Sequence, residues 1–294
     1  MTSPARPAAD TPWGGLPAAE PVLHARHNLE LVIVEIRYAG ATGSFGSDSA
    51  IALREALEAI DVDLPALEAV KNQEVSLQVG PDGPDARVTA RDVGWQLASA
   101  DGRTSAVVSS EVIRVQTANY VRWSESLARP LEVILRAAHP LLLPQLVSRI
   151  GVRFINRFTD PQARSPRAWL GRIERPFLGP IADDVCGEHL QASQQQLDLT
   201  LGPAQGAIVR HGAFPDPAER GAVSYLLDVD TYNQAGLRPD PGTILEEATR
   251  LDRTALALFQ QITTPAFREQ MSPYPREEPS TDPTSATYAQ EENA

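Results

Sequence analysis

Arginine occurs at every fourth position of the stretch RIGVRFINRF, residues 149–158. Neighbouring side chains of a β-strand point to opposite faces, so Arg149, Arg153 and Arg157 would share one face of a strand. The other face would carry apolar residues together with Asn156. Seven arginines fall between residues 149 and 175, and guanidinium groups gathered in this way suit carboxylate or phosphate groups.

The stretch LLDVD places Asp228 and Asp230 two residues apart, so that both carboxylates would lie on one face of a strand. Two such carboxylates could share a Mg²⁺ and support phosphoryl transfer. They could also form ion pairs with arginines on adjacent strands, and we favour this interpretation because cross-strand charge pairs are common. The candidate ligand-binding or partner-binding residues are Arg37, Arg153, Asn156, Arg157, Asp228 and Asp230, with Glu35 as a further ion-pair partner.

Other residues give little indication of catalysis. The sequence contains no phosphate loop, no GxGxxG and no HExxH. Cys186 and His189 are three residues apart, but so common a pair favours a packing role over a nucleophile with its base. One cysteine and five histidines do not have the spacing of a zinc site. We therefore assign no catalytic residue and expect no metal and no cofactor.

Composition narrows the class of protein. The formal net charge of −12 disfavours extended nucleic-acid binding, because it repels phosphate. No apolar stretch reaches the roughly 18 residues that a membrane helix needs. The N-terminus lacks the basic start and apolar core of a secretory signal, and the single cysteine suits a reducing compartment, so we expect a cytoplasmic protein. Lys71 is the only lysine among 26 basic residues, which indicates a GC-rich bacterial genome.

The two ends of the chain differ from the rest in composition. Residues 1–23 are rich in Pro and Ala, and residues 271–294 are rich in Pro, Ser, Thr and Glu. Both hold too few aliphatic side chains to offset the entropy of ordering, so we predict a disordered leader and a disordered acidic tail. The body is predicted to consist of two α+β halves, residues 24–146 and 147–270.

Each half shows the same predicted order of elements: strand, helix, three strands, helix. In the first half these elements cover 28–40, 49–60, 74–80, 86–99, 104–120 and 121–140. In the second half they cover 148–158, 165–173, 188–202, 206–214, 222–233 and 242–262. Ser47, Asp48 or Ser49 would cap the first helix, and Pro130 would either kink the helix over 121–140 or open a new helical segment.

The repeated order suggests an internal duplication, in which Ile36-Arg37-Tyr38 aligns with Val152-Arg153-Phe154. Runs of adjacent strands favour an α+β fold: two similar β-α-β-β-β-α halves with antiparallel sheets covered by helices. The pattern does not choose between two sheets side by side and one continuous sheet. Trp95, Trp123 and Trp169 are interpreted as core or interface residues, and Trp13 as a docking residue or one without a role.

Several short motifs resemble a family of bacterial proteins of similar length that occurs sporadically among genomes. The motifs are EIRY at 35–38, YVRW at 120–123, IGVRFINR at 150–157, LDVD at 227–230 and FQQIT at 259–263. The resemblance spans nearly the whole body and implies no established activity, cofactor or substrate. The scattered occurrence of the family is similar to that of genes carried on mobile or defence-related islands.

Two functions are compatible with these features. The first is a non-enzymatic protein-interaction module with a protein partner, whose gene could be a neighbour of this one. The second is an enzyme or sensor for a small anionic ligand or a metal, which would use a cleft between the two halves. In that alternative the arginines would hold an anionic group, and Asp228 and Asp230 would hold a metal or act as a base.

Overall fold

The computed structural model describes residues 11–20, 29–80 and 83–271, with the backbone alone over 72–80 and 83–92. The predicted leader at 1–10 and 21–23, the turn residues Pro81 and Asp82, and the tail beyond Met271 lie outside the described residues. The strands are β1 (Leu29–Ala39), β2 (Ala66–Gly80), β3 (Gly83–Ala98), β4 (Thr104–Ser109), β5 (Val112–Thr117), β6 (Leu146–Phe158), β7 (Ser193–Thr200), β8 (Gln205–Pro215) and β9 (Val223–Asn233). The α-helices are α1 (Ser47–Glu58), α2 (Arg129–Leu142), α3 (Arg175–Leu178), α4 (Cys186–His189), α5 (Pro241–Ile262) and α6 (Pro265–Gln270).

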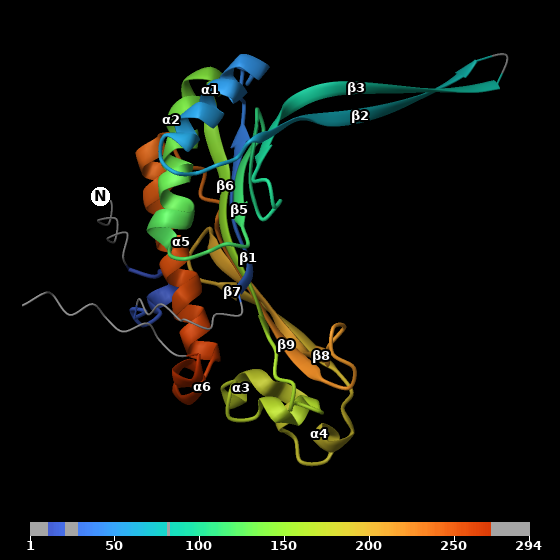
Figure 1. The fold of residues 1–294 in the computed structure, drawn as a ribbon, viewed down its shortest axis with the longest axis vertical. Coiled ribbons are helices and arrows are strands. Elements are labelled where there is room, and N and C mark those ends of the chain that lie inside the picture. Colours follow the sequence, from blue (N-terminus) through green and yellow to red (C-terminus); the bar gives the residue numbers. More distant parts are fainter. Residues whose placement is uncertain (1–10, 21–28, 81–82, 272–294) are drawn as a thin grey trace, which may run out of the picture.

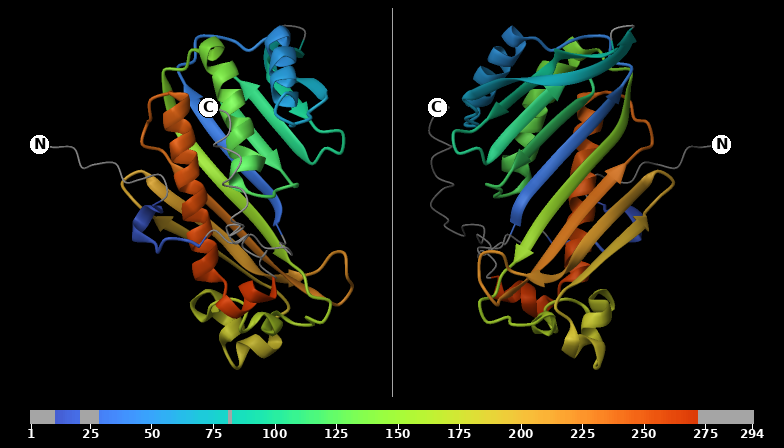
Figure 2. Two further views of the ribbon diagram at one scale, coloured as in Figure 1. Left: turned by 60° about the vertical axis from the view of Figure 1, so that its left-hand side comes forward. Right: turned by 90° about the vertical axis from the view of Figure 1, so that its right-hand side faces the viewer.

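All nine strands form a single antiparallel sheet in the order β2-β3-β4-β5-β1-β6-β9-β8-β7 (Figure 2). β1 and β6 pair at its centre, with Val34 opposite Val152 and Ile36 opposite Ile150. The α+β class predicted from the sequence is therefore confirmed, and one continuous sheet joins the two halves. Read outward from the centre, the strand order is β1, β5, β4, β3 on one side and β6, β9, β8, β7 on the other.

Helices α1, α2 and α5 lie on one face of the sheet (Figures 1 and 2). Alternate residues of the central strands are buried beneath them, including Val32 and Val34 of β1 and Ile150 and Val152 of β6. Helix α5 spans both hydrophobic clusters, because Leu251 belongs to one cluster and Leu258 to the other. Among the described residues, no helix is both long and apolar enough to span a membrane.

Three predictions for the first half need correction. Residues 104–120 form a hairpin, β4 and β5, because the chain turns at Ser110 and Glu111. Helix α1 begins at Ser47 after Gly46, and no side chain caps it, so the predicted caps lie inside the helix. Residues 121–140 divide into the π-helical turn η2 (Ser124–Ala128) and α2, and Pro130 stands in the first turn of α2. The backbone angles of Trp123, Ala128 and Arg129 are all helical, so η2 continues directly into α2 and Pro130 follows the π-helical turn within one helical stretch.

The helix predicted over 165–173 is wrong. Residues 166–169 make only a short 3₁₀ turn, η3 (Pro166–Trp169), and a second turn, η4 (Gly179–Ala182), follows α3. Trp169 is fully buried, and its indole N–H donates to the carbonyl of Val223. The Trp169 ring packs against Phe158, Tyr225 and Phe267, which holds the segment against β8 and β9. The interpretation of Trp95, Trp123 and Trp169 as packing residues is confirmed, since all three contact or belong to a hydrophobic cluster.

The prediction of a disordered leader is wrong for residues 11–20, which lie against α5. The indole N–H of Trp13 donates to Glu247 Oε1 at 2.9 Å, and the Arg250 guanidinium lies 5.0 Å from the centre of the Trp13 ring. Glu247 and Arg250 are almost fully buried, and Glu247 Oε1 also accepts from Asn233 Nδ2 at 2.8 Å. Further along, the Gln260 side chain donates to the carbonyl of Glu20 and accepts from its N–H. Residues 11–20 are therefore part of the folded body.

We expect Trp13→Ala to lower the free energy of unfolding by roughly 2 kcal/mol, because it removes a hydrogen bond to a buried carboxylate and a cation–π contact. Trp13→Phe keeps the ring above Arg250 and loses only the N–H donor, so it should cost less. Chemical denaturation of the two variants and the wild type measures the difference. Equal stability of Trp13→Ala and wild type would contradict the docked arrangement of residues 11–20.

Candidate functional site

The face of the sheet opposite α1, α2 and α5, here called the open face, carries the arginines and carboxylates singled out in the sequence. Alternation along β6 sends Arg149, Arg153 and Arg157 to this face, while Ile150 and Val152 point into the core. The same alternation brings Asp228 and Asp230 of β9 onto it, because Val229 between them is buried. The open face is broad, and none of the helices in the described part of the chain lies against it (Figure 2).

Arg153 and Asp228 form the shortest bidentate pair of the open face. Arg153 Nε and Nη2 each donate to one oxygen of Asp228 at 2.7 Å. The Asp228 side chain is only 4% exposed, and Arg210 of β8 lies 3.6 Å from it on the other side. The hydrogen bonds to Asp228 raise the pKa of Arg153 despite its partial burial. One buried carboxylate is thus held between two arginines from different strands.

Arg149 and Asp230 form a second pair one step along the same strands. Arg149 Nη2 lies 3.1 Å from Asp230 Oδ1, and the guanidinium lies 5.5 Å from the centre of the Tyr232 ring. Burial raises the pKa of the Asp230 carboxyl, although the charge of Arg149 opposes this. The guanidinium of Arg149 lies across Gly151, where a Cβ atom would be 2.2 Å from Nη1. A glycine at this position therefore leaves room for the arginine to lie flat on the sheet.

Glu35 is the carboxylate of β1 that pairs with arginines at the centre of the open face. Arg37 Nε donates to Glu35 Oε1 at 2.7 Å, and Arg114 Nε of β5 donates to Glu35 Oε2 at 2.9 Å. Arg149 Nη1 is a third neighbour at 3.9 Å. Burial disfavours the charged form of Glu35, but the two hydrogen-bonding arginines outweigh it, and the pKa is lowered. Glu35 therefore joins the charge pairs of the two halves across the centre of the sheet.

Arg157 lies at the far end of β6 and has different partners. Its Nη2 donates to Asp216 Oδ1 at 2.7 Å, and its Nη1 to Glu30 Oε1 at 3.3 Å. The hydroxyl of Ser224 and the N–H of Ala218 also donate to Asp216, and together with Arg157 they lower its pKa to about 2. Arg157 therefore links Asp216, in the loop after β8, to Glu30 of the central strand β1.

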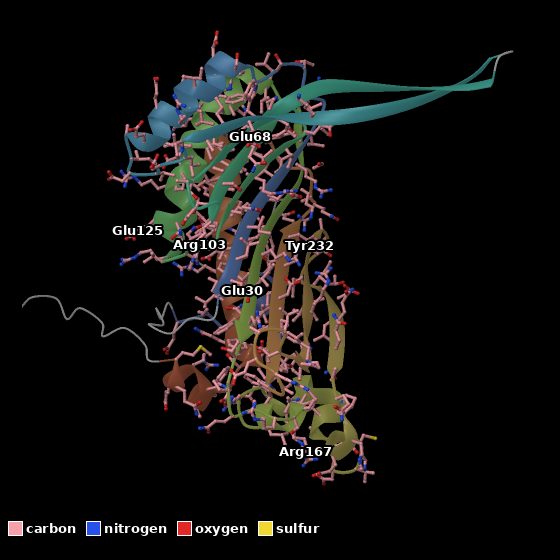
Figure 3. The ribbon with its side chains drawn as sticks, turned by 45° about the vertical axis from the view of Figure 1, so that its right-hand side comes forward. Glu30, Glu68, Arg103, Glu125, Arg167 and Tyr232 are labelled. Carbon is pink, nitrogen blue, oxygen red and sulfur yellow. The ribbon has the colours of Figure 1, made fainter. Side chains whose placement is uncertain are left out.

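Of the six candidate residues, the structure brings five onto the open face and places the sixth elsewhere. Asn156 points to the helix-covered side, is 8% exposed, and donates from Nδ2 to the carbonyl of Leu227 at 3.3 Å. Asn156 is a sheet-stabilising residue in this position. Arg167 and Arg172 also lie away from the open face: Arg172 pairs with Asp160, and Arg167 lies among the short helices at the end of the molecule (Figure 3).

Sequence reasoning missed Arg114, Arg210 and Asp216. Arg114 and Arg210 each alternate with buried residues of their strand, so the pattern contains the information that they face away from the core. Nothing local indicates which carboxylate they meet, because that depends on strand order and register. Asp216 follows Pro215 in a loop, and only the fold brings it to Arg157.

The geometry allows a test of the two alternatives for Asp228 and Asp230. Both carboxylates already accept hydrogen bonds from arginines, which fits ion pairing better than a shared Mg²⁺. No group of three or more His, Cys, Asp or Glu residues within the described ranges has the geometry to hold a metal. A shallow depression of about 420 Å³ is lined by Arg37, Glu111 and Ser148, among others. A second, of about 410 Å³, lies near Asp61 and Asp101. Neither depression is lined by Arg153 or Asp228.

Fold and site together define an α+β protein whose sheet carries helices on one face and paired charges on the other. Comparison of the chain with protein-family models and with curated proteins found no match. The resemblance to a sporadic bacterial family, and the cytoplasmic location, stay predictions.

Proposed function

We propose that this chain is a protein-interaction module that binds a protein surface on its open face. The main support for this proposal is the network of ion pairs on that face. In this network, Glu35, Asp228 and Asp230 hold arginines from β1, β5, β6 and β8 in place. Charged groups held in this way keep one geometry before a partner arrives, which favours specific recognition. Binding modules without catalysis need no concave pocket, whereas small-ligand sites are usually concave.

The dimensions of the open face support this proposal. The seven strands β4, β5, β1, β6, β9, β8 and β7 at about 4.8 Å spacing, with strands about 30 Å long, give a surface of roughly 1,000 Å². A stable protein complex buries about 800 Å² on each partner. The face is therefore large enough for a protein partner of ordinary size.

We also infer that the two halves arose by internal duplication. The alignment of Arg37 with Arg153 also aligns Glu35 with Gly151, and these two residues lie opposite one another in the sheet. A two-fold axis through that pair exchanges β1 with β6, and the matching strand orders on either side follow from it. The first half carries β2 as an additional strand.

Site-specific photo-crosslinking tests the proposed function. A photoreactive residue is introduced at Gln116, which lies on the open face beside Ile33, and separately at Arg136, whose side chain is 73% exposed on α2. We expect covalent adducts with protein at Gln116 and few at Arg136 after irradiation in host cells. Mass spectrometry identifies the captured chain. Equal or absent adducts at the two positions would contradict the proposal.

A further inference from the structure

The hairpin of β2 and β3 extends beyond the rest of the sheet. Among the described residues, β3 pairs with β4 only over Gly94–Ala98, so residues 72–80 and 83–92, here called the arm, form strand pairs only with each other. The arm leaves the body on the side away from α1, α2 and α5, which is the side of the open face (Figure 1). A bulge between Val70 and Lys71 marks the point where it departs.

The residues of the arm alternate in polarity in register across both strands. One set of paired positions holds Gln73, Val75, Leu77 and Val79 opposite Ala90, Val88, Ala86 and Pro84. The other set holds Glu74, Ser76 and Gln78 opposite Thr89, Arg87 and Asp85. In a two-stranded ribbon such a pattern gives one apolar side and one polar side. A ribbon of this kind is only marginally stable alone and needs a surface to cover its apolar side.

The open face offers a matching surface. Leu31 of β1 lies opposite Ile155 of β6, and Ile33 follows on the same face; all three are only half-buried although they lie at the centre of the sheet. The centre of the face and residues 72–92 carry net charges of opposite sign, while Glu74, Asp85 and Arg87 belong to the polar set of the arm, on the side away from the contact. Five arginines (37, 114, 149, 153 and 210) against Glu35, Asp228 and Asp230 give the centre of the face +2. Residues 72–92 carry Glu74, Asp82, Asp85 and Asp92 against Arg87 and Arg91, which gives −2.

We propose that the partner of the open face is a second copy of this chain, and that each copy lays its arm across the apolar centre, Leu31, Ile33 and Ile155, of the other. The inference rests on the proposed function and names its partner. In a two-fold dimer, the arm of each copy covers the open face of the other, so the same contact forms twice and both apolar surfaces are buried. Each arm is about 33 Å long and 10 Å wide, so two reciprocal contacts bury roughly 1,300 Å², within the range of stable interfaces.

Light scattering coupled to size exclusion tests the dimer over a range of protein concentrations. The wild type is expected at twice the chain mass of 31.8 kDa. Leu77→Lys changes a position of the apolar set, and Gln78→Lys places the same charge on the neighbouring position of the polar set. We expect Leu77→Lys to be monomeric and Gln78→Lys to remain dimeric. A third variant, in which an Asn-Gly turn replaces residues 73–90, should be monomeric as well.

The inference is overturned by a wild type that is monomeric at every concentration, as an arm folded onto its own open face would give, and equally by a Leu77→Lys variant that stays dimeric. Circular dichroism of each variant separates loss of dimer from loss of fold. The crosslinking at Gln116 separates this inference from the proposed function. Adducts of a different protein there, with a monomeric wild type, leave the interaction module standing and remove the second copy. A dimer that forms without adducts at Gln116 removes the open face as the binding surface, and the inference with it.

Discussion

Arg153→Ala should lower the free energy of unfolding by about 2–3 kcal/mol, because it leaves the carboxylate of Asp228 buried with a single arginine neighbour. The Asp228 side chain is 4% exposed, so water gives it little compensation. Arg210 at 3.6 Å remains as a partner and keeps the loss below that of a fully uncompensated charge. Urea denaturation of the purified variant measures the effect.

Arg37→Ala is the matched control. Arg37 also pairs with a carboxylate of the open face, but its side chain is 59% exposed and Glu35 retains Arg114. We expect a change within about 0.5 kcal/mol, as is usual for exposed pairs. The double variant Arg153→Ala with Asp228→Ala should recover part of the loss, because no buried charge is left behind. If Arg153→Ala and Arg37→Ala lowered the free energy of unfolding equally, the burial of Asp228 would not make the loss of its arginine more destabilising.

Asp252→Asn should stabilise the protein at pH 8 and have little effect near pH 4. Burial on α5 raises the pKa of the Asp252 carboxyl from 3.8 to about 7, with only partial opposition from Arg253. Between pH 3.8 and about 7, the two pKa values of Asp252, the folded state keeps a proton that the unfolded chain has released. Stability therefore falls as the pH rises through this range. Above pH 7 the full cost of a buried carboxylate is present, at about 1.4 kcal/mol for each unit of pKa shift. The gain from Asn at pH 8 should therefore be a few kcal/mol at most.

Denaturation of Asp252→Asn and wild type at several pH values measures this difference. Carboxyl ¹³C shifts of the wild type give the titration of Asp252 directly, and its midpoint is expected near 7. A midpoint near 4, or a stability difference that does not change with pH, would contradict the burial of this carboxyl.

The sequence indicates which residues share a face but not which residues meet. The two faces of RIGVRFINRF follow from alternation alone, and the structure places Arg149, Arg153 and Arg157 on the side opposite the core. Their partners depend on register: Arg153 lies directly opposite Asp230, yet its guanidinium reaches diagonally to Asp228. Charge pairs of this kind require the order of strands, which no local pattern contains.

The predicted boundaries of elements were wrong where local sequence signals were weak. The turn at Ser110 and Glu111 has neither Gly nor Pro, so β4 and β5 resemble one long strand. Trp13 resembles part of a polar, flexible leader because its partners on α5 lie more than two hundred positions away in the sequence. Glu247, Arg250 and Asp252 are charged residues of α5 that are buried, and their burial depends on segments that pack beside the helix.

The pairing of β1 with β6 has a consequence for folding kinetics. These central strands are separated in the sequence by α1, the β2–β5 strands and α2, so their contact closes a long loop. Closing it costs chain entropy before any hydrogen bond between the two strands is gained. Proteins dominated by such distant contacts fold slowly. Until β1 and β6 pair, each presents an unpaired strand edge, and during that interval the folding chain is most prone to aggregate.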